Sequence, residues 1–256
     1  MATLDADATL RAELYDRRMR EMDRGDSELY AALARDAEGP ALELACGTGR
    51  IYLDALAEGC DVDGFDRSAE MLAFLRERAA ERGIEPSVWR ADMTDFAVDR
   101  EYELAYCPFN AVQHLLTIEN QLDALRNVYD ALAPGGRFVF DVFVPSFELI
   151  AETYGEWRTE SVELREVPYK FRTRTRITDE VEQQFTVENE LYDPDGSRVV
   201  AESHRLKMLP KREVELLARR SPFEEWTVRG GFETIEADAT IEDGDSVQVW
   251  TLRKRA

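Results

Sequence analysis

The chain has 256 residues, of which 53 are acidic and 32 are basic, so its formal net charge is −21 at pH 7. Hydrophobic residues make up 44% of the chain, which is enough for a full core and excludes disorder as its overall state. Its apolar runs are far shorter than the ~20 residues that span a bilayer, so no membrane-spanning helix is predicted. Its charged N-terminus lacks the apolar segment of a secretion signal. Its three cysteines have no CxxC spacing and favour a reduced, cytoplasmic compartment.

The first part of the chain predicts a helical segment followed by alternating strands and helices. Residues 1–39 have the pattern of two helices, which we expect to form a lid, and a core follows over 40–144. Within this core, strands are expected at 41–45, 62–65, 86–90, 104–107 and 138–144, and helices at 50–58, after Ser68 and at 118–132. This alternation predicts a doubly wound, Rossmann-like α/β fold with a mostly parallel sheet.

A different pattern begins near residue 145. Polar and apolar residues alternate over 169–177 and 181–192, a turn is expected at 193–196, and a further strand follows at 198–209. We therefore predict an antiparallel β-meander over 145–210, inserted after the fifth strand. Residues 211–256 would then complete the main sheet, with a helix near 214–218 and a closing pair of strands at 234–241 and 247–252.

The strongest chemical signal is a glycine-rich turn after the first strand. Gly47 and Gly49 would place backbone N–H groups and a helix N-terminus beside a ligand, and a missing Cβ lets the ligand approach the main chain. The GxGxxG pattern of dinucleotide-binding proteins is broken, because position 52 is Tyr52. Glu43 also suits a cationic amino group better than a pyrophosphate. The alternative interpretation is an ordinary strand–turn–helix with tight glycines.

Two carboxylates end the next two strands. Asp66 lies 17 residues after Gly49, at a place where a carboxylate can accept hydrogen bonds from both hydroxyls of a ribose. Asp92, with the amide of Met93 after it, could contact the edge of an adenine. The alternatives are a helix cap for Asp66 and a plain loop residue for Asp92.

Four segments, in order, resemble the motifs of the class I S-adenosylmethionine-dependent methyltransferases. They are ELACGTGR at 43–50, GFDRSAEML at 64–72, ADMTDF at 91–96 and LAPGGRF at 132–138. The resemblance covers residues 41–144 and includes a plausible last strand at 247–252, so it implies a seven-stranded sheet. One departure is Ala45, which stands where the family usually has glycine.

The resemblance implies S-adenosylmethionine as the cofactor and assigns residues to it. Gly47 and Gly49 would pass under the methionine part, and Glu43 would support the turn and the amino group. Asp66 would hold the ribose hydroxyls and Met71 would pack beside the adenine. The remaining residues of the implied cofactor site are Ala45, Arg67, Asp92, Met93 and Phe109.

The methyl acceptor is less clearly indicated. The fourth strand leads into CPFNAVQH at 107–114, which is not the Asn/Asp-Pro-Pro-Tyr/Phe motif of enzymes that methylate nitrogens in DNA or protein. His114 is a candidate base, because the unperturbed pKa of histidine lies near neutrality, or else a residue that bonds a backbone carbonyl. Tyr15 resembles the tyrosine of the N-terminal helix that folds over the cofactor in small-molecule methyltransferases, or else simply packs on the core. His204 is expected at the surface.

The predicted function is methyl transfer from S-adenosylmethionine to nitrogen or oxygen of a small-molecule acceptor, enclosed by the 109–114 loop, the helix around Tyr15 and the insertion. The insertion resembles that of the subgroup acting on sugars and amines, so it would cover the site or form a homodimer. The alternatives are a non-catalytic interaction protein with the cofactor fold, and an RNA or protein methyltransferase. The acidic charge disfavours nucleic acid as a partner. An acidic chain that is poor in lysine, with four in all, is also typical of halophilic proteins. No membrane partner and no metal site are predicted.

Overall fold

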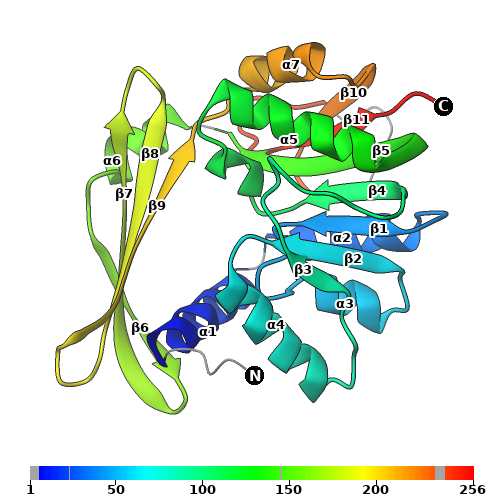
Figure 1. The fold of residues 1–256 in the computed structure, drawn as a ribbon. Helices are drawn as coiled ribbons and strands as arrows, with labels where there is room; N and C mark the ends of the chain where they lie inside the picture. The colour runs from blue at the N-terminus through cyan, green and yellow to red at the C-terminus, as the bar shows by residue number, and fades with distance from the viewer. Residues whose placement is uncertain (1–5, 23, 145, 234–239) are drawn as a thin grey trace.

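The computed structural model describes residues 6–22, 24–144, 146–233 and 240–256. Figure 1 shows a large sheet between two layers of helices, with a second sheet standing beside it. The large sheet has seven strands in the order β10-β11-β5-β4-β1-β2-β3. Its strands are β1 (Ala41–Leu44), β2 (Val62–Asp66), β3 (Val88–Arg90), β4 (Tyr102–Cys107), β5 (Leu132–Phe143), β10 (Glu225–Gly230) and β11 (Val247–Arg253).

The direction of these strands confirms the predicted fold. β11 runs antiparallel to both of its neighbours, β5 and β10, and the other pairs are parallel. The helices are α1 (Ala6–Glu21), α2 (Asp26–Arg35), α3 (Tyr52–Ala57), α4 (Ala69–Glu81), the short 3-10 helix η1 (Ala111–His114), α5 (Ile118–Ala131), α6 (Phe147–Thr153) and α7 (Lys211–Arg220). The result is a doubly wound sheet with one reversed strand near its edge.

The core lies on both faces of the large sheet, as the apolar strands predict. Buried side chains of α5 and α7 pack on one face, and those of α2, α3 and α4 pack on the other. The helix after β2 begins where the sequence predicts, because the Ser68 hydroxyl accepts a hydrogen bond from the amide of Met71 at 3.2 Å. Among the described residues, no helix is long and apolar enough to cross a membrane.

The predicted insertion is a four-stranded antiparallel sheet in the order β6-β7-β8-β9. Its strands are β6 (Arg158–Leu164), β7 (Val167–Asp179), β8 (Gln184–Tyr192) and β9 (Arg198–Lys207). Leu14 of α1 packs with five of its buried side chains: Val162, Leu164, Phe171, Leu191 and Val200. The N-terminal helix therefore shares a hydrophobic cluster with the insertion.

The closing strand pair differs from the prediction. Residues 234–239 lie outside the described residues, and residues 240 and 241 are not in a strand. The partner of β11 is instead β10, with Trp226 opposite Leu252 and Val228 opposite Trp250. The physical reason is that Trp226 and Val228 alternate with polar residues and so fit an edge strand with one apolar face.

Candidate active site

The glycine turn lies at the carboxyl edge of the sheet, next to the central strand β1. Ala45, Gly47 and Gly49 all have left-handed backbone conformations, with φ of 55°, 56° and 82°. Ala45 adopts this conformation although it carries a Cβ, which explains why glycine is usual in the family at this position. The turn therefore depends on backbone conformations that few residues adopt without strain.

The two glycines of the turn face different surroundings. A Cβ on Gly47 would lie 3.7 Å from the ring of Tyr15, which is ordinary contact distance, so Tyr15 of the N-terminal helix covers this side of the turn. A Cβ on Gly49 would lie 2.8 Å from Leu75 and 2.9 Å from Leu53. Gly49 thus allows α3 and α4 to pack closely on the turn, and its predicted contact with a cofactor stays a prediction.

Asp66, at the end of β2, holds the turn by hydrogen bonds. Its Oδ2 accepts from the amide of Gly47 at 3.0 Å, and its Oδ1 accepts from the amide of Ser68 at 2.8 Å. Burial raises the pKa of Asp66, while these amides act in the opposite direction. The amide of Arg67 acts on the carboxylate in the same way. The carboxylate therefore joins the ends of β1 and β2, and amides already occupy most of its lone pairs.

Glu43 is a buried carboxyl group without a hydrogen-bonding partner on one oxygen. Its side chain is 2% exposed. Within the described part of the chain, neither its Oε2 nor the neighbouring hydroxyl of Tyr106 has a partner at bonding geometry, although each of these two groups shifts the pKa of the other. Burial raises the pKa of Glu43 to about 8, and the nearby Tyr106 and Arg50 act in the opposite direction. Such an unpartnered oxygen is the kind of group that a cationic ligand stabilises.

Asp141 of β5 is a functional candidate that the sequence analysis missed. It is fully buried, and it accepts hydrogen bonds from the amides of Phe109 at 2.8 Å and Asn110 at 3.1 Å. Both of these loop residues have φ near +60°. Tyr30 donates its hydroxyl to Asp141 at 2.8 Å, and Arg24 lies 3.3 Å away. Asp141 thus fixes the loop after β4 to the N-terminal helices.

A second ion pair that was not predicted lies close to this loop. Arg50 donates two hydrogen bonds to Asp26, at 2.9 Å and 2.6 Å, and Asp26 is only 1% exposed. The guanidinium groups of Arg24 and Arg50 lie 4.8 Å and 5.7 Å from the ring centre of Phe109. These contacts place the ring of Phe109 against the arginines beside the glycine turn.

Tyr15 extends from α1 over the glycine turn. Burial and the negative charge of Asp66 raise the pKa of Tyr15 to about 12, while Arg50 acts in the opposite direction. The phenol therefore keeps its proton at neutral pH, so it can donate a hydrogen bond but does not act as a base. Its predicted place near the cofactor turn fits this geometry.

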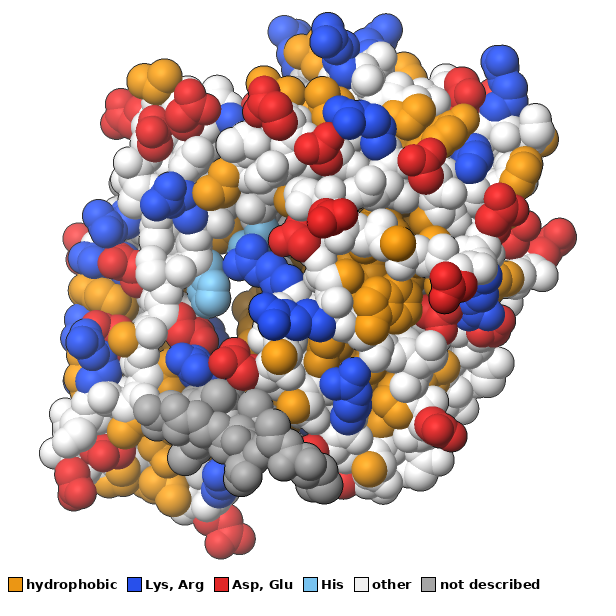
Figure 2. Space-filling model, in the orientation of Figure 1, with side chains coloured by type: hydrophobic (Ala, Val, Ile, Leu, Met, Phe, Trp, Pro, Cys, Tyr) orange, Lys and Arg blue, Asp and Glu red, His pale blue; other side chains and the backbone are white. Residues whose placement is uncertain are grey.

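His114 lies in η1 and faces the antiparallel sheet. Its ring centre is 6.3 Å from that of His204 of β9, and the two planes are nearly perpendicular, at 88°. Figure 2 shows histidine side chains in a hollow between the two sheets, with basic side chains at its edge. His204, expected at the surface, has a side chain that is 43% exposed, and its ring faces His114.

The environment changes the acid–base properties of His114. The side chain is exposed to the hollow, and neighbouring protein atoms remove part of its hydration. This loss of hydration, with the charges of His204 and Arg67, lowers the pKa of His114 to about 4. The sequence does not show these neighbours, so it indicates only the unperturbed value. The role of His114 as a base stays a prediction.

The other predicted cofactor residues lie around the ends of β2 and β3. Met71 is half-buried in the first turn of α4, and Arg67 is exposed, with its carbonyl accepting a hydrogen bond from Arg90 at 2.9 Å. Asp92 is exposed, and its Oδ1 accepts from the amide and hydroxyl of Thr94, at 2.9 Å and 2.8 Å. Its other oxygen has no such bond, so the predicted role at the adenine stays a prediction.

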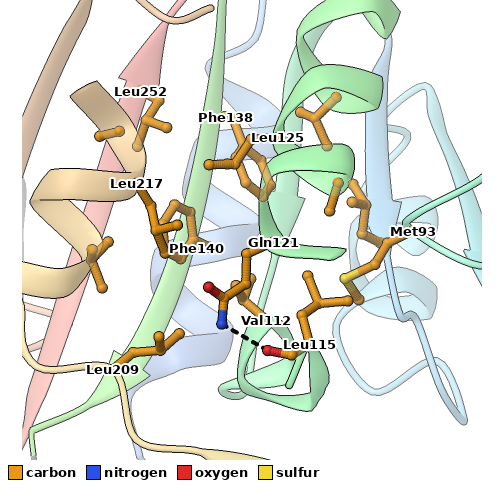
Figure 3. A pocket seen from close by; sticks show the side chains of 15 residues that line it. Met93, Val112, Leu115, Gln121, Leu125, Phe138, Phe140, Leu209, Leu217 and Leu252 are labelled. Atoms are coloured by element: carbon orange, nitrogen blue, oxygen red, sulfur yellow. Dashed lines mark hydrogen bonds between the residues drawn. The ribbon is translucent and has the colours of Figure 1, made fainter. Parts of the chain in front are cut away.

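The side chain of Met93 points away from this edge. It lines an internal cavity of about 20 Å³ between the sheet, α5 and α7, shown in Figure 3, where Gln121 donates to the carbonyl of Leu115 at 2.8 Å. This apolar space is large enough for about one water molecule and is separate from the turn. Only the backbone of Met93 is therefore available for the predicted contact with adenine.

Comparison with known proteins identifies a methyltransferase domain. The model of a family described as a methyltransferase domain matches residues 41–136. This segment runs from β1 to the beginning of β5 and contains the glycine turn, Asp66 and the loop after β4. Residues 41–136 are therefore a methyltransferase domain, and the chain as a whole has the class I methyltransferase fold. The donor of that class is S-adenosylmethionine.

Individual relatives agree with this assignment. This methyltransferase is 25% identical to the putative methyltransferase YqeM of Bacillus subtilis (strain 168) over 236 residues, covering 90% of the chain and 92% of the relative. It is 33% identical to the dTDP-3-amino-3,6-dideoxy-alpha-D-glucopyranose N,N-dimethyltransferase of Streptomyces fradiae over 120 residues, covering 44% of the chain and 45% of that enzyme. The crystal structure of an S-adenosylmethionine-dependent methyltransferase from Clostridium acetobutylicum ATCC 824 has a TM-score of 0.75 at 16% identity and covers 96% of this chain and 98% of that one.

Two features at the turn fit S-adenosylmethionine. The Asp66 carboxylate can accept from a ribose hydroxyl in addition to the amides that it already binds. Glu43 offers a buried carboxyl oxygen to an ammonium group. Both features are properties of this chain, and each matches a different part of the cofactor. At Gly47, by contrast, the ring of Tyr15 lies at ordinary contact distance from the place of a Cβ.

Proposed function

We propose that this methyltransferase transfers the methyl group of S-adenosylmethionine to a nitrogen or oxygen atom of a small-molecule acceptor. The observation that carries the proposal is the placement of two covering elements around the carboxyl edge of the sheet. Tyr15 of α1 lies over the glycine turn, and His204 of β9 faces His114 of η1 across the hollow. A hollow covered by a helix and a second sheet suits a small acceptor and excludes a folded macromolecule.

The chain contributes mainly binding and orientation. When bound, the cofactor supplies a methyl group that is already activated by the positive charge on sulfur. Asp66 would hold the ribose of the cofactor, Glu43 would hold its amino group, and Tyr15 would cover it from the side of α1. Orientation of this kind contributes up to roughly 7–11 kcal/mol to a two-substrate reaction. The covering elements also exclude water, which strengthens each polar contact with the acceptor.

A nitrogen acceptor is favoured over oxygen by one relative. The Streptomyces fradiae enzyme is named as an N,N-dimethyltransferase of an amino sugar, and its 33% identity extends over 120 residues. A neutral amine carries its own lone pair, so the enzyme needs to remove a proton only after or during transfer. His114 is neutral above pH about 4 and can accept a hydrogen bond from that N–H.

Calorimetry with S-adenosylhomocysteine, the demethylated product, tests the donor site. We expect the wild type to bind it, and Asp66→Ala to bind it about 10–100-fold more weakly, because the ribose loses a buried acceptor worth ~1–3 kcal/mol. Asp61→Ala is the control, since Asp61 is exposed and pairs with Arg100. Absence of binding to the wild type at near-millimolar concentration would overturn the proposal.

Turnover of His114→Ala tests the acceptor side. We expect a larger loss in kcat than in affinity for S-adenosylhomocysteine, because His114 faces the hollow and not the glycine turn. With a pKa of about 4, His114 should not change its charge between pH 6 and pH 8. A wild-type rate that falls sharply below pH 7 and becomes flat in His114→Ala would contradict this assignment of the pKa.

Two further expectations accompany the proposal. A homodimer formed through the antiparallel sheet stays a prediction, and light scattering on the purified protein measures it directly. A high-salt, cytoplasmic environment also stays a prediction from the charge of −21. If it is correct, stability should increase with salt, because ions screen the repulsion between acidic side chains.

A further inference from the structure

The register of the antiparallel sheet divides its side chains between two faces. Phe171 of β7 pairs with Leu191 of β8, which pairs with Val200 of β9. These three side chains are buried together with Leu14 of α1, so their face is the inner face of the sheet. Because side chains alternate along a strand, every second residue counted from these three also lies on the inner face.

The inner face contacts the rest of the molecule at two separated places on β9. At the first, Val200 packs against Leu14 of α1. At the second, His204 lies opposite His114 of η1. Four residues separate Val200 from His204, which corresponds to roughly 13 Å along a strand. The part of the sheet between them therefore extends from α1 to η1, the elements that carry Tyr15 and His114.

Two rows of side chains cross the inner face in this interval, as the strand pairing shows. The first row is Thr173, Asn189 and Glu202, and the second is Thr175, Val187 and His204. All six side chains are half-buried. We call the five polar members the polar band: Thr173, Thr175, Asn189, Glu202 and His204.

The polar band lies between apolar neighbours and has few partners of its own. Beyond its second row, the inner face continues with Ile177, Phe185 and Leu206. Within the band, Glu202 lies 3.4 Å from His204. In the described part of the chain, the side chains of Thr173, Thr175 and Asn189 make no hydrogen bond. Polar groups placed together on the covered face of a sheet, without internal partners, are typical of a binding surface.

We propose that the polar band recognises the methyl acceptor and that Glu202 is its main specificity-determining residue. The inference rests on the proposed function and adds the protein groups that select the acceptor. Threonine hydroxyls and the asparagine amide both donate and accept hydrogen bonds, so they match hydroxyl groups. The Glu202 carboxylate accepts only, so it matches N–H groups. The acceptor class that fits is a small amine that carries several hydroxyl groups.

The charges around the band are mixed. Arg158 continues the first row, opposite Thr173, and it is exposed at the edge strand β6. The charge of Arg67 acts on His114. Because guanidinium groups do not attract an amine, selection of an amine rests on the Glu202 carboxylate and not on the surrounding charges.

Methyl transfer to defined amines tests the proposal. The probes are dTDP-3-amino-3,6-dideoxy-α-D-glucopyranose, glucosamine and 2-amino-1,3-propanediol, each incubated with S-adenosylmethionine, with formation of S-adenosylhomocysteine as the readout. We expect at least one probe to be methylated. Glu202→Gln should then raise its KM about 10-fold or more while kcat stays within about 3-fold, since a charge-assisted hydrogen bond to the bound amine is lost.

A matched control lies on the other face of the same sheet. Glu188 of β8 faces outward, where it pairs with Arg174 and Arg176, so Glu188→Gln makes the same change in charge away from the hollow. It should leave KM unchanged. Glu202→Asp keeps the charge and should recover part of the lost affinity. Circular dichroism on each variant verifies that the sheet is folded.

The outcomes separate this inference from the proposed function. Equal KM values for Glu202→Gln and Glu188→Gln would overturn the role of the band. If the wild type binds S-adenosylhomocysteine but methylates none of the three amines, the acceptor class is wrong while the donor assignment remains. If the wild type does not bind S-adenosylhomocysteine, the proposed function itself fails.

Discussion

The two sides of the hollow are held in different ways. On the donor side, carboxylates bind backbone amides: Asp66 accepts from two amides, and the fully buried Asp141 accepts from two others. On the acceptor side, the antiparallel sheet meets the N-terminal helix through the packing of Leu14 and through exposed ion pairs such as that of Arg165 with Glu13, at 2.7 Å. The donor side is therefore built into the backbone, and the acceptor side is joined by side chains.

This difference has consequences for stability and for specificity. Removing one partner from a buried charge pair costs about 3–5 kcal/mol, whereas an exposed ion pair contributes about 0–1 kcal/mol. The donor side should tolerate few substitutions, because each one also disturbs the core. The acceptor side can change its side chains with little loss of stability, which suits a surface that selects the acceptor.

The largest expected effect is that of Asp141→Asn. The substitution keeps the shape, but it removes the negative charge opposite Arg24, and the new NH2 group faces N–H and O–H donors. We expect the free energy of unfolding to fall by about 3–5 kcal/mol. Urea denaturation followed by circular dichroism measures it.

The corresponding change on the acceptor side is Arg165→Gln. Its pair with Glu13 is exposed, so the free energy of unfolding should fall by less than about 1 kcal/mol. Similar losses in both variants would break the comparison, since the two sides would then depend equally on their ion pairs.

A second test compares the two glycines of the turn. Gly49→Ala combines a left-handed backbone with a Cβ only 2.8 Å from Leu75, and it should cost about 2–4 kcal/mol of stability. Gly47→Ala meets no atom closer than 3.7 Å and should cost about 1–2 kcal/mol, the strain alone. It should instead weaken binding of S-adenosylhomocysteine, measured by calorimetry. Equal unfolding midpoints would show that Gly49 has no packing role.

The donor side was largely predictable from the sequence because its signals are local. The glycines, Asp66 and the Ser68 cap each lie within a few residues of the strand end that they serve, and the apolar pattern fixed the order of strands and helices. The signal for Asp141 was also present, since it is a charged residue in the apolar run 138–144. Its partners were not predictable, because Tyr30 is 111 residues away in the chain.

The acceptor side was less predictable because it depends on the pairing of distant strands. Alternation indicated that 169–209 form strands, but it did not indicate which face covers the core. The expectation that His204 lies at the surface therefore did not include which face of the sheet it occupies, and only the register with Val187 places it on the inner face. The edge strand β10 was not recognised as the partner of β11 because both are short and lie beyond the insertion.

The pH dependence of stability examines the buried carboxyl on the donor side. Glu43 has a pKa of about 8 in the folded chain and about 4.5 when unfolded, so the folded state retains a proton that the unfolded state loses. Glu43 therefore makes the free energy of unfolding fall as pH rises from about 4.5 to 8, by up to ~1.4 kcal/mol per pH unit. Urea denaturation at several pH values should show a smaller decrease in Glu43→Gln. If the free energies of unfolding of the wild type and Glu43→Gln decrease equally with pH, the pKa of Glu43 is not raised by folding and its carboxyl group is in contact with water.

The smallest expected effect joins the two sides. Burial is the main cause of the low pKa of His114, about 4, and His204 is the second. His204→Gln removes the second imidazole ring, so the pKa of His114 should rise, but it should stay below 6.5 because the other protein atoms around His114 remain. The chain has two histidines, so the variant has a single imidazole signal that NMR can titrate without an assignment. A pKa that remains at about 4 would mean that the rings are too far apart in solution to interact, and a pKa of 6.5 would mean that the hollow is open to water. The titration of His114 therefore reports how closely the antiparallel sheet lies on the core. An acceptor held between Glu202 and the donor must fit into that space.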